Sequence, residues 1–345
     1  MPTPDLLPPV VWSTPLRTRF RNLDVRDGVL LRGEAGWGEL SPFWDYDDIE
    51  SATWLRAARE AADLGFPAPV RDRVPVNVTV PAVGPRRARE IVLASGGCRT
   101  AKVKVAQRGP SVPGGRPGEV EPLAAEAVRV AAVRSAFDEL YGPGAGAIRV
   151  DANGGWTLDE ALARIPALDA EARGLEYVEQ PCASVPELAA VRRRLAVSVP
   201  VAADESIRRA ADPLRVVRED AADVVVLKVQ PLGGVRACLD LAEQVGLPVV
   251  VSSALESSVG LAAGVALAAA LPDLPYACGL ATAQLLTRDV VAEPLLPTDG
   301  AIAVRRPEPD PAACAAAAAD DATRDRWLAR YARLAELQAR DGVPA

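Results

Sequence analysis

The feature that most constrains the fold is a unit that recurs from residue 74 onward. Each unit has a short Val- and Ile-rich run, a polar residue at the end of the run, and a stretch rich in Ala, Leu and Arg. The end residues Asp151, Glu179, Asp204, Lys228 and Ser252 follow one another at intervals of 28, 25, 24 and 24 residues. This spacing suits one buried strand plus one covering helix, so the chain predicts a parallel α/β sheet with both faces covered.

Eight strand-like runs can be identified. They occupy residues 74–80, 99–105, 147–153, 175–181, 199–206, 223–230, 247–253 and, more weakly, 276–280; helices are expected at 157–172, 184–196, 208–221 and 233–245. Eight such units close most economically into a (β/α) TIM-type barrel, and an open doubly wound sheet is the main alternative. We favour the barrel because polar residues end consecutive strands, and a barrel gathers strand ends around one centre.

The segments that flank these units have a different pattern. Residues 1–73 combine period-2 alternation, turn-like segments and a helix near 48–64, which predicts a small α+β capping domain. Residues 74–281 form the predicted barrel domain, and residues 282–345 are predicted to pack beside the N-terminal domain through a helix near 320–340. The Pro/Gly-rich loop 107–118 is interpreted either as a lid or as a disordered segment.

Composition excludes several classes of function. The chain has no His, which rules out Ser-His-Asp and Cys-His catalysis and His-ligated zinc. A net charge of −7 argues against nucleic acid or an anionic membrane as a partner. With no leader-like N-terminus and no apolar segment long enough to span a bilayer, we expect a cytoplasmic protein that acts on a small molecule. The five Cys are widely spaced, which indicates reduced thiols.

Lysine is rare in this chain. Of 39 basic residues only Lys102, Lys104 and Lys228 are lysines, and all three lie in strand-like runs. Arg keeps its proton in proteins, whereas a buried Lys can become a neutral amine, so these three are candidates for proton transfer or covalent chemistry. Lys102 and Lys104 have the spacing of one strand face, and each is expected to lower the pKa of the other. Lys228 is expected across the cavity from them; a salt bridge in the core is the alternative role, and it is most credible for Lys102.

Three carboxylates end successive strands. Asp151, Glu179 and Asp204 are expected to converge at the barrel mouth, where like charges repel unless a cation joins them. Oxygen ligands without His or thiolate select a hard ion, so Mg²⁺ is predicted first and Mn²⁺ second. The alternative is that each carboxylate caps a helix or pairs with an Arg. A metal flanked by opposed lysines suits removal of a proton from carbon next to a carboxylate.

The chain resembles the enolase superfamily, and within it the o-succinylbenzoate synthases of menaquinone biosynthesis of the actinobacterial type. The resemblance rests on six motifs that occur in this order: AKVKV, RVDANGGW, YVEQPC, AADES, VVLKVQPLGG and SSALESSVGLAAG. The resemblance spans nearly the whole chain, including GWGELSPFWDYD near the N-terminus. It implies an α+β capping domain on a modified (β/α) barrel. It also implies Mg²⁺-assisted syn elimination of water from SHCHC (2-succinyl-6-hydroxy-2,4-cyclohexadiene-1-carboxylate), giving o-succinylbenzoate through an enediolate.

The resemblance also implies roles for individual residues. Lys104 would be the base and then the acid, Lys228 would stabilise the enediolate through a cation–π contact, and Lys102 would support the charge. The implied metal ligands are Asp151, Glu179 and Asp204. Arg149 and Asn153 are expected to line the cavity. The expected role of Ser252, Ser253 and Glu256 is to face the succinyl tail of the substrate or to orient Lys228. The capping segments 17–20 and 44–46 are expected to close over the substrate.

Other functions remain open on the sequence alone. Relatives in the same superfamily use two lysines and a metal to racemise N-acylamino acids or epimerise dipeptides. A Schiff-base aldolase on Lys228 would leave the three carboxylates unexplained. A non-catalytic ligand-binding barrel is the remaining alternative. The sequence does not predict the oligomeric state.

Overall fold

A parallel sheet of seven strands forms the centre of the protein. The computed structural model describes residues 8–21, 23–108 and 120–340. The strands lie in the order in which they occur in the chain, and all neighbours are parallel. They are β5 (Val78–Val80), β6 (Thr100–Lys104), β7 (Ala147–Asp151), β8 (Leu175–Glu179), β9 (Val201–Ala203), β10 (Val224–Leu227) and β11 (Val249–Val251).

The eighth strand-like run closes the sheet into a ring without forming a regular strand. On one side, the Asn77 amide donates to the Cys278 carbonyl at 2.9 Å. On the other side, the Gly279 amide donates to the Val251 carbonyl at 2.8 Å. Residues 276–280 therefore connect the first barrel strand to the last, and the predicted barrel, rather than the open sheet, is confirmed.

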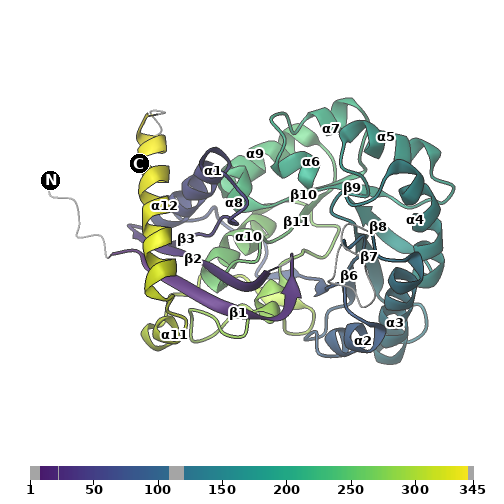
Figure 1. The fold of residues 1–345 in the computed structure, drawn as a ribbon, viewed down its shortest axis with the longest axis horizontal. Helices are drawn as coiled ribbons and strands as arrows, with labels where there is room; N and C mark the ends of the chain where they lie inside the picture. The colour runs from purple at the N-terminus through teal and green to yellow at the C-terminus, as the bar shows by residue number, and fades with distance from the viewer. Residues whose placement is uncertain (1–7, 22, 109–119, 341–345) are drawn as a thin grey trace.

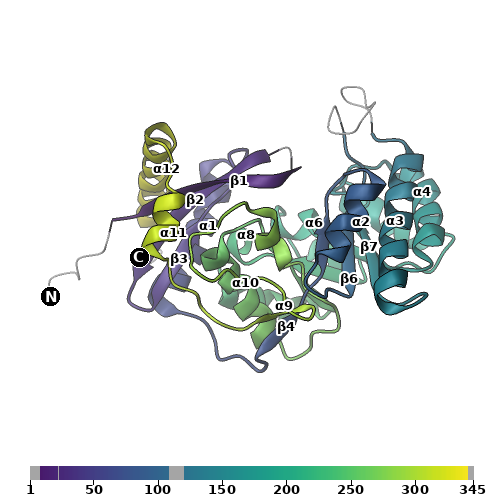
Figure 2. The same ribbon diagram turned by 90° about the horizontal axis from the view of Figure 1, so that it is seen from below.

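Helices cover the outer face of the barrel (Figures 1 and 2). They are α2 (Pro85–Leu93), α3 (Leu123–Tyr141), α4 (Leu158–Ala172), α5 (Val185–Arg194), α9 (Val235–Val245) and α10 (Ser258–Ala270). A short helix, α8 (Val229–Leu232), begins directly after Lys228. Three of the four predicted helices are confirmed to within a few residues.

The helix expected at 208–221 is wrong. The chain forms two single turns there, α6 (Glu205–Arg208) and α7 (Arg215–Arg218). Pro213 lies between them and lacks the amide that a continuous helix needs, and it disfavours helical geometry at the residue before it.

The capping domain is a three-stranded antiparallel sheet with one helix. Its elements are β1 (Val10–Phe20), β2 (Leu23–Gly33), β3 (Gly36–Leu40) and α1 (Asp48–Arg59), which continues into the π-helical turn η1 (Glu60–Leu64). Helix α1 begins at a capping box in which Asp47 accepts from the Glu50 amide. The predicted α+β architecture of this region is thus present, while the exact boundary at residue 73 stays a prediction.

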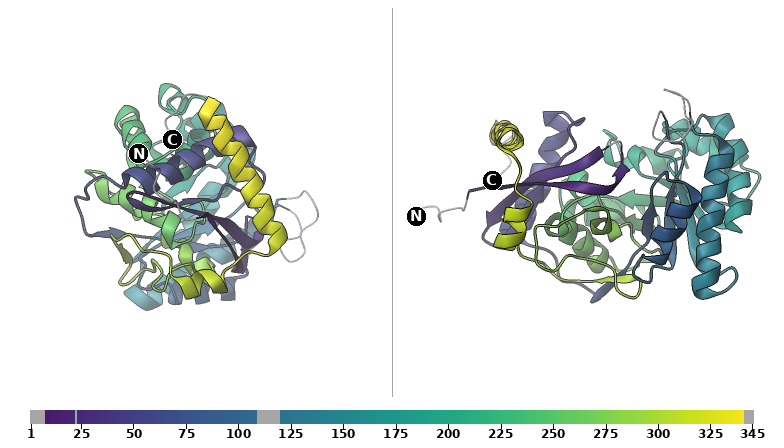
Figure 3. Two further views of the ribbon diagram at one scale, coloured as in Figure 1. Left: turned by 90° about the vertical axis from the view of Figure 1, so that its left-hand side faces the viewer. Right: turned by 60° about the horizontal axis from the view of Figure 1, so that its bottom comes forward.

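The C-terminal segment returns to the capping domain. It contains η2 (Ala281–Leu285), β12 (Ala301–Ala303), which pairs with β4 (Arg73–Pro75), α11 (Pro311–Ala316) and α12 (Asp321–Arg340). Helix α12 lies along the capping domain (Figures 1 and 3), where the Trp44 and Trp327 ring centroids are 4.5 Å apart. In this structure α12 therefore packs against the capping domain, while the bounds of the C-terminal segment stay a prediction.

Two further predictions concern the loop 107–118 and the lack of a membrane-spanning segment. Residues 109–118 of the predicted loop lie outside the described residues. Among the described segments, none of the helices has both the length and the hydrophobicity needed to cross a bilayer.

Candidate active site

The period of two along each barrel strand decides which side chains enter the barrel. Val103, Val150 and Val178 point outward into the core beneath the helices, so their neighbours in sequence point inward. Near the bottom, the barrel interior is apolar and contains Tyr177, Ala202, Val224, Val226 and Val250. Arg149 is in register with Tyr177 in this layer, whereas the carboxylates Asp151, Glu179 and Asp204 lie above it, at the carboxyl ends of the strands, which is where barrel enzymes place their chemistry.

A cavity lies between the barrel mouth and the capping domain. Its barrel side includes Lys102, Lys104, Asn153, Lys228, Ser252 and Ser253, and its capping side includes Phe20, Arg21, Phe43, Tyr46 and Trp54. Phe20, at the end of β1, lies over Lys104, with 5.5 Å between the ring centroid and Nζ. A wider, more open cavity adjoins it and shares Phe20, Lys104 and Asn153.

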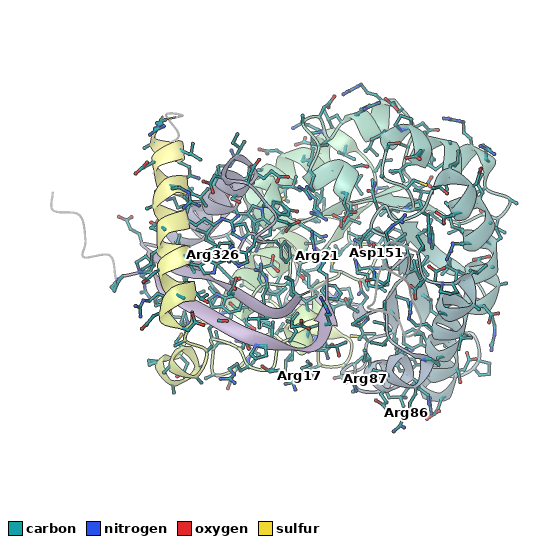
Figure 4. The ribbon with its side chains drawn as sticks, in the orientation of Figure 1. Arg17, Arg21, Arg86, Arg87, Asp151 and Arg326 are labelled. Atoms are coloured by element: carbon teal, nitrogen blue, oxygen red, sulfur yellow. The ribbon has the colours of Figure 1, made fainter. Side chains whose placement is uncertain are left out.

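The three predicted carboxylates are fully buried at neighbouring strand ends. Asp151 and Glu179 end β7 and β8 and are register partners, and Asp204 directly follows β9. Figure 4 shows Asp151 within the barrel and Arg21 on the side of the capping domain that faces it. The structure therefore brings the three carboxylates to one end of the barrel, as the strand spacing predicts.

Each carboxylate is held by a lysine ammonium group. Lys102 Nζ donates to both oxygens of Glu179, at 2.9 and 3.0 Å, and lies 3.3 Å from Asp151 Oδ2. Lys104 Nζ donates to Asp151 Oδ2 at 2.5 Å and to Asn153 Oδ1 at 2.8 Å. These contacts place the two lysines of β6 in one network.

Lys228 completes this arrangement from β10. Its Nζ donates to Asp204 Oδ2 at 2.6 Å, and it lines the same cavity as Lys102 and Lys104. All three lysines of the chain thus meet at one cavity.

The carboxylates interact with one another electrostatically. The pKa of Glu179 is raised to about 7, because burial and the charges of Asp151 and Asp204 together outweigh the opposing Lys102 ammonium. Burial also acts to raise the pKa of Asp151, but Lys104 and Lys102 outweigh it and lower that pKa well below the usual range. The part of the Glu179 shift that comes from Asp151 and Asp204 is the repulsion that the sequence predicts for converging carboxylates.

The pKa values of Lys228 and Lys102 shift in opposite directions. Burial lowers the pKa of Lys228, although Asp204 opposes the effect. For Lys102 the expected lowering is wrong: burial lowers the pKa, but Glu179 and Asp151 outweigh it and raise the pKa above its ordinary value. Lys102 is therefore suited to remain a cation that compensates the carboxylates.

The donor set fits a hard divalent ion, because it offers buried carboxylate oxygens whose mutual repulsion a cation would relieve. Within the described ranges, no group of three or more His, Cys, Asp or Glu side chains is arranged to hold a metal ion. The oxygens of the three buried carboxylates instead accept hydrogen bonds from Lys102, Lys104 and Lys228. Metal binding by Asp151, Glu179 and Asp204 therefore stays a prediction.

The remaining predicted residues divide into two groups. Asn153, Ser252 and Ser253 line the cavity. Arg149 does not: it precedes Asp151 by two residues and so lies one layer deeper, where its Nη1 donates to the Ala277 carbonyl at 2.6 Å.

Glu256 is also away from the cavity wall. It is buried, and its carboxylate accepts from the Ala254 amide at 2.9 Å. Arg149 and Glu256 thus support the site from below and from behind rather than facing the cavity.

Several residues at the site were not predicted. Arg208 Nε donates to Asp204 Oδ1 at 2.9 Å, and its guanidinium also bonds the Tyr46 hydroxyl of the capping domain. Its position four residues after Asp204 is a signal that could have indicated this pair. Trp54 and Arg21 enter the cavity from the capping domain, and no local pattern announces them.

Comparison with known proteins places this geometry in a family. Residues 11–62 match the family model "Enolase N-terminal domain-like", and residues 85–309 match "Enolase C-terminal domain-like". The o-succinylbenzoate synthase of Thermobifida fusca is 60% identical over 321 residues, covering 93% of this chain and 94% of the relative. The chain belongs to the enolase superfamily. A second relative, the o-succinylbenzoate synthase of Mycolicibacterium smegmatis, is 52% identical and covers 93% of this chain and 92% of its own length.

Solved structures share the fold. The muconate lactonizing enzyme from Pseudomonas fluorescens superposes with a TM-score of 0.72 at 21% identity, covering 90% of this chain and 97% of that one. The expected combination of a barrel and an N-terminal capping domain is thereby confirmed.

Proposed function

We propose that the chain is an o-succinylbenzoate synthase that dehydrates SHCHC to o-succinylbenzoate in menaquinone biosynthesis. The observation that carries the proposal is the meeting of all three lysines with three buried carboxylates at one cavity, in a chain 60% identical to an enzyme of that name. No His is available in the chain for the proton transfers, so an amine is the natural base.

The metal site is assigned to Asp151, Glu179 and Asp204. Enzymes of the enolase superfamily generally depend on a divalent metal ion, and the oxygen donors favour Mg²⁺, with Mn²⁺ as the alternative. When bound, the ion supplies positive charge that neutralises the substrate carboxylate as the neighbouring carbon loses its proton.

Lys104 carries the proton. As a free amine it takes the proton from the ring carbon next to the carboxylate, and the electron pair of that C–H bond enters the enediolate. The resulting ammonium then gives the proton to the hydroxyl on the same face as the C–O bond breaks, so that water leaves and the ring becomes aromatic. Asn153 Oδ1, which accepts from Lys104 Nζ at 2.8 Å, orients the group.

The other lysines stabilise charge. Lys228 comes from β10 and lies in position to face the ring as a cation, while Lys102 keeps Glu179 and Asp151 compensated. Ser252 and Ser253 are assigned to the succinyl tail because they line the same cavity. Phe20 over Lys104 excludes water from the reacting amine. We propose that these steps take place in the cytoplasm.

The test is incubation of the purified chain with SHCHC and Mg²⁺, followed through the absorbance of the aromatic product. Stoichiometric o-succinylbenzoate is expected, and its absence from a folded preparation contradicts the proposal. Incubation with an N-succinylamino acid in deuterated solvent tests the racemase alternative. Deuterium entering the α-position while SHCHC stays unchanged would favour the racemase.

A further inference from the structure

One wall of the cavity is a loop between β11 and α10. Residues 252–255 of this loop line the cavity, and residues 256 and 257 lead into the helix. Leu255 has a φ of +66°, in the left-handed region that residues other than Gly rarely adopt. Such a conformation persists where surrounding groups hold it, so the loop's neighbours decide the shape of this wall.

Arg26, on β2 of the capping domain, holds the carbonyl groups of the loop. Its Nε donates to the Leu255 carbonyl at 3.0 Å, and its Nη2 lies 3.4 Å from the Ala254 carbonyl. The guanidinium also lies over the ring of Phe43, at 4.4 Å from the centroid. Arg26 is only 2% exposed and does not line the cavity, yet it joins cavity-lining residues of both domains.

Glu39, on β3, holds the other end of the loop. Its carboxylate accepts from the Ser257 amide and the Gly260 amide, each at 3.2 Å, and from the Ser257 hydroxyl. Ser257 is the N-cap of α10, where free amide groups and the helix dipole favour an anion. A side-chain Cβ at Gly260 would lie 2.8 Å from Glu39 Cδ, so the helix needs glycine there to admit the carboxylate.

We propose that Arg26 and Glu39 are positioning residues of the active site, which fix the loop 252–257 from the capping domain and thereby set the cavity wall that faces the substrate. The docking of the two domains then determines the shape of the substrate pocket, without either residue touching the substrate. This inference rests on the proposed function only in the choice of ligand for its test.

Asp289 provides a matched control. Its carboxylate accepts from the Ser258 amide at 3.1 Å and from the Ser258 hydroxyl at 2.6 Å, so it serves the same helix end, but it belongs to the C-terminal segment and lines no part of the central cavity. Glu39→Gln and Asp289→Asn each replace a charged carboxylate by a neutral amide, which has one acceptor oxygen in place of two. Only the first change weakens a contact between the loop and the capping domain.

The experiment compares both variants with the wild type by hydrogen exchange of peptides that cover 252–257, and by affinity for o-succinylbenzoate with Mg²⁺. For Glu39→Gln we expect faster exchange in the loop and affinity weakened about tenfold or more, because small displacements of substrate-facing groups have large effects. For Asp289→Asn we expect exchange and affinity within about twofold of the wild type, since the loop keeps its contacts. Equal effects of the two variants, or no effect of Glu39→Gln on either readout, overturn the inference.

A second variant covers the case in which Glu39→Gln does not fold. Arg26→Lys keeps the charge but replaces the planar guanidinium, whose Nε and Nη2 reach the two carbonyl groups separately, by a single nitrogen. It is therefore expected to give the same loop exchange and loss of affinity; wild-type behaviour of Arg26→Lys overturns the inference. A wild-type protein that binds no o-succinylbenzoate counts against the proposed function instead, and loop exchange then still decides the positioning role.

Discussion

Replacing Lys104 by Ala separates chemistry from stability. The side chain is about 10% exposed, and its truncation removes three buried methylene groups, which corresponds to roughly 2 kcal/mol of folding free energy at ~0.8 kcal/mol each. Asp151 is not left unpaired, because Lys102 remains 3.3 Å away. A domain stable by about 5–15 kcal/mol therefore stays folded.

The effect on turnover is expected to be much larger. Loss of a general acid–base group lowers kcat by roughly 10⁴-fold, or about 5 kcal/mol of activation free energy. Loss of folded protein cannot explain such a fall if the variant still unfolds cooperatively. Thermal unfolding and steady-state dehydration of SHCHC measure the two effects side by side.

Asn153→Ala is the matched control for Lys104→Ala. It removes the second partner of the Lys104 ammonium, at 2.8 Å, but leaves the amine, so kcat is expected to fall by only about tenfold. Methylamine is expected to restore part of the activity of Lys104→Ala by occupying the vacated space. A Lys104→Ala variant within tenfold of the wild-type kcat would refute the reasoning.

Three further predictions concern the metal dependence of turnover, the pH dependence of stability and the melting temperature. Removal of divalent ions with EDTA is expected to abolish turnover. Asp204→Asn is expected to raise the Mg²⁺ concentration for half-maximal activity about tenfold or more, measured by metal titration. An unchanged titration contradicts the assigned ligand. Burial raises the pKa of Glu39 from 4.5 to about 7, against hydrogen bonds from Ser257 and Ser41 and with help from Glu256. The folded state then binds the proton more tightly than the unfolded state does. The free energy of unfolding of the wild type should therefore fall, relative to that of Glu39→Gln, by about 3 kcal/mol as the pH rises from 4.5 to 7. Urea unfolding across this range measures the difference, and a flat profile would exclude it. Arg330→Met should destabilise the protein by about 3 kcal/mol, because Arg330 donates to the carbonyl groups of Phe43 and Tyr46 and to the Ser51 hydroxyl in the interior. Arg326 is exposed, so Arg326→Met should change the stability by under about 1 kcal/mol. Similar melting temperatures for the two variants would contradict this prediction.

The barrel was predictable because its cause is local and repeated. Each buried strand needs a continuous apolar run, and each parallel connection needs a helix, so both leave a period in the sequence. The period does not report where backbone pairing stops. Residues 276–280 close the ring through isolated bridges, and Pro213 interrupts a stretch whose composition suits a helix.

The centre of the site was predictable for a related reason. Strand ends of a parallel barrel converge, so Asp151, Glu179 and Lys228 could be placed together from their spacing alone. Alternation gives the face of a strand but not the depth along it. Arg149 therefore shares a face with Asp151 and yet lies below the cavity.

The capping side of the site could not be derived in the same way. Trp54 and Arg21 reach the cavity, and Arg26 and Glu39 reach the barrel loop, only because two separately folded parts dock. Docking depends on the complementary shape of whole surfaces, which no short motif encodes. The barrel thus presents the chemistry, while the capping domain shapes the space in which it occurs.

The measurement that tests the central claim most directly is a crystal structure with Mg²⁺ and o-succinylbenzoate bound. We predict one ion held by the carboxylates of Asp151, Glu179 and Asp204, with the aromatic ring between Lys104 and Lys228. An ion bound by other residues, or a product molecule outside this cavity, would contradict the account.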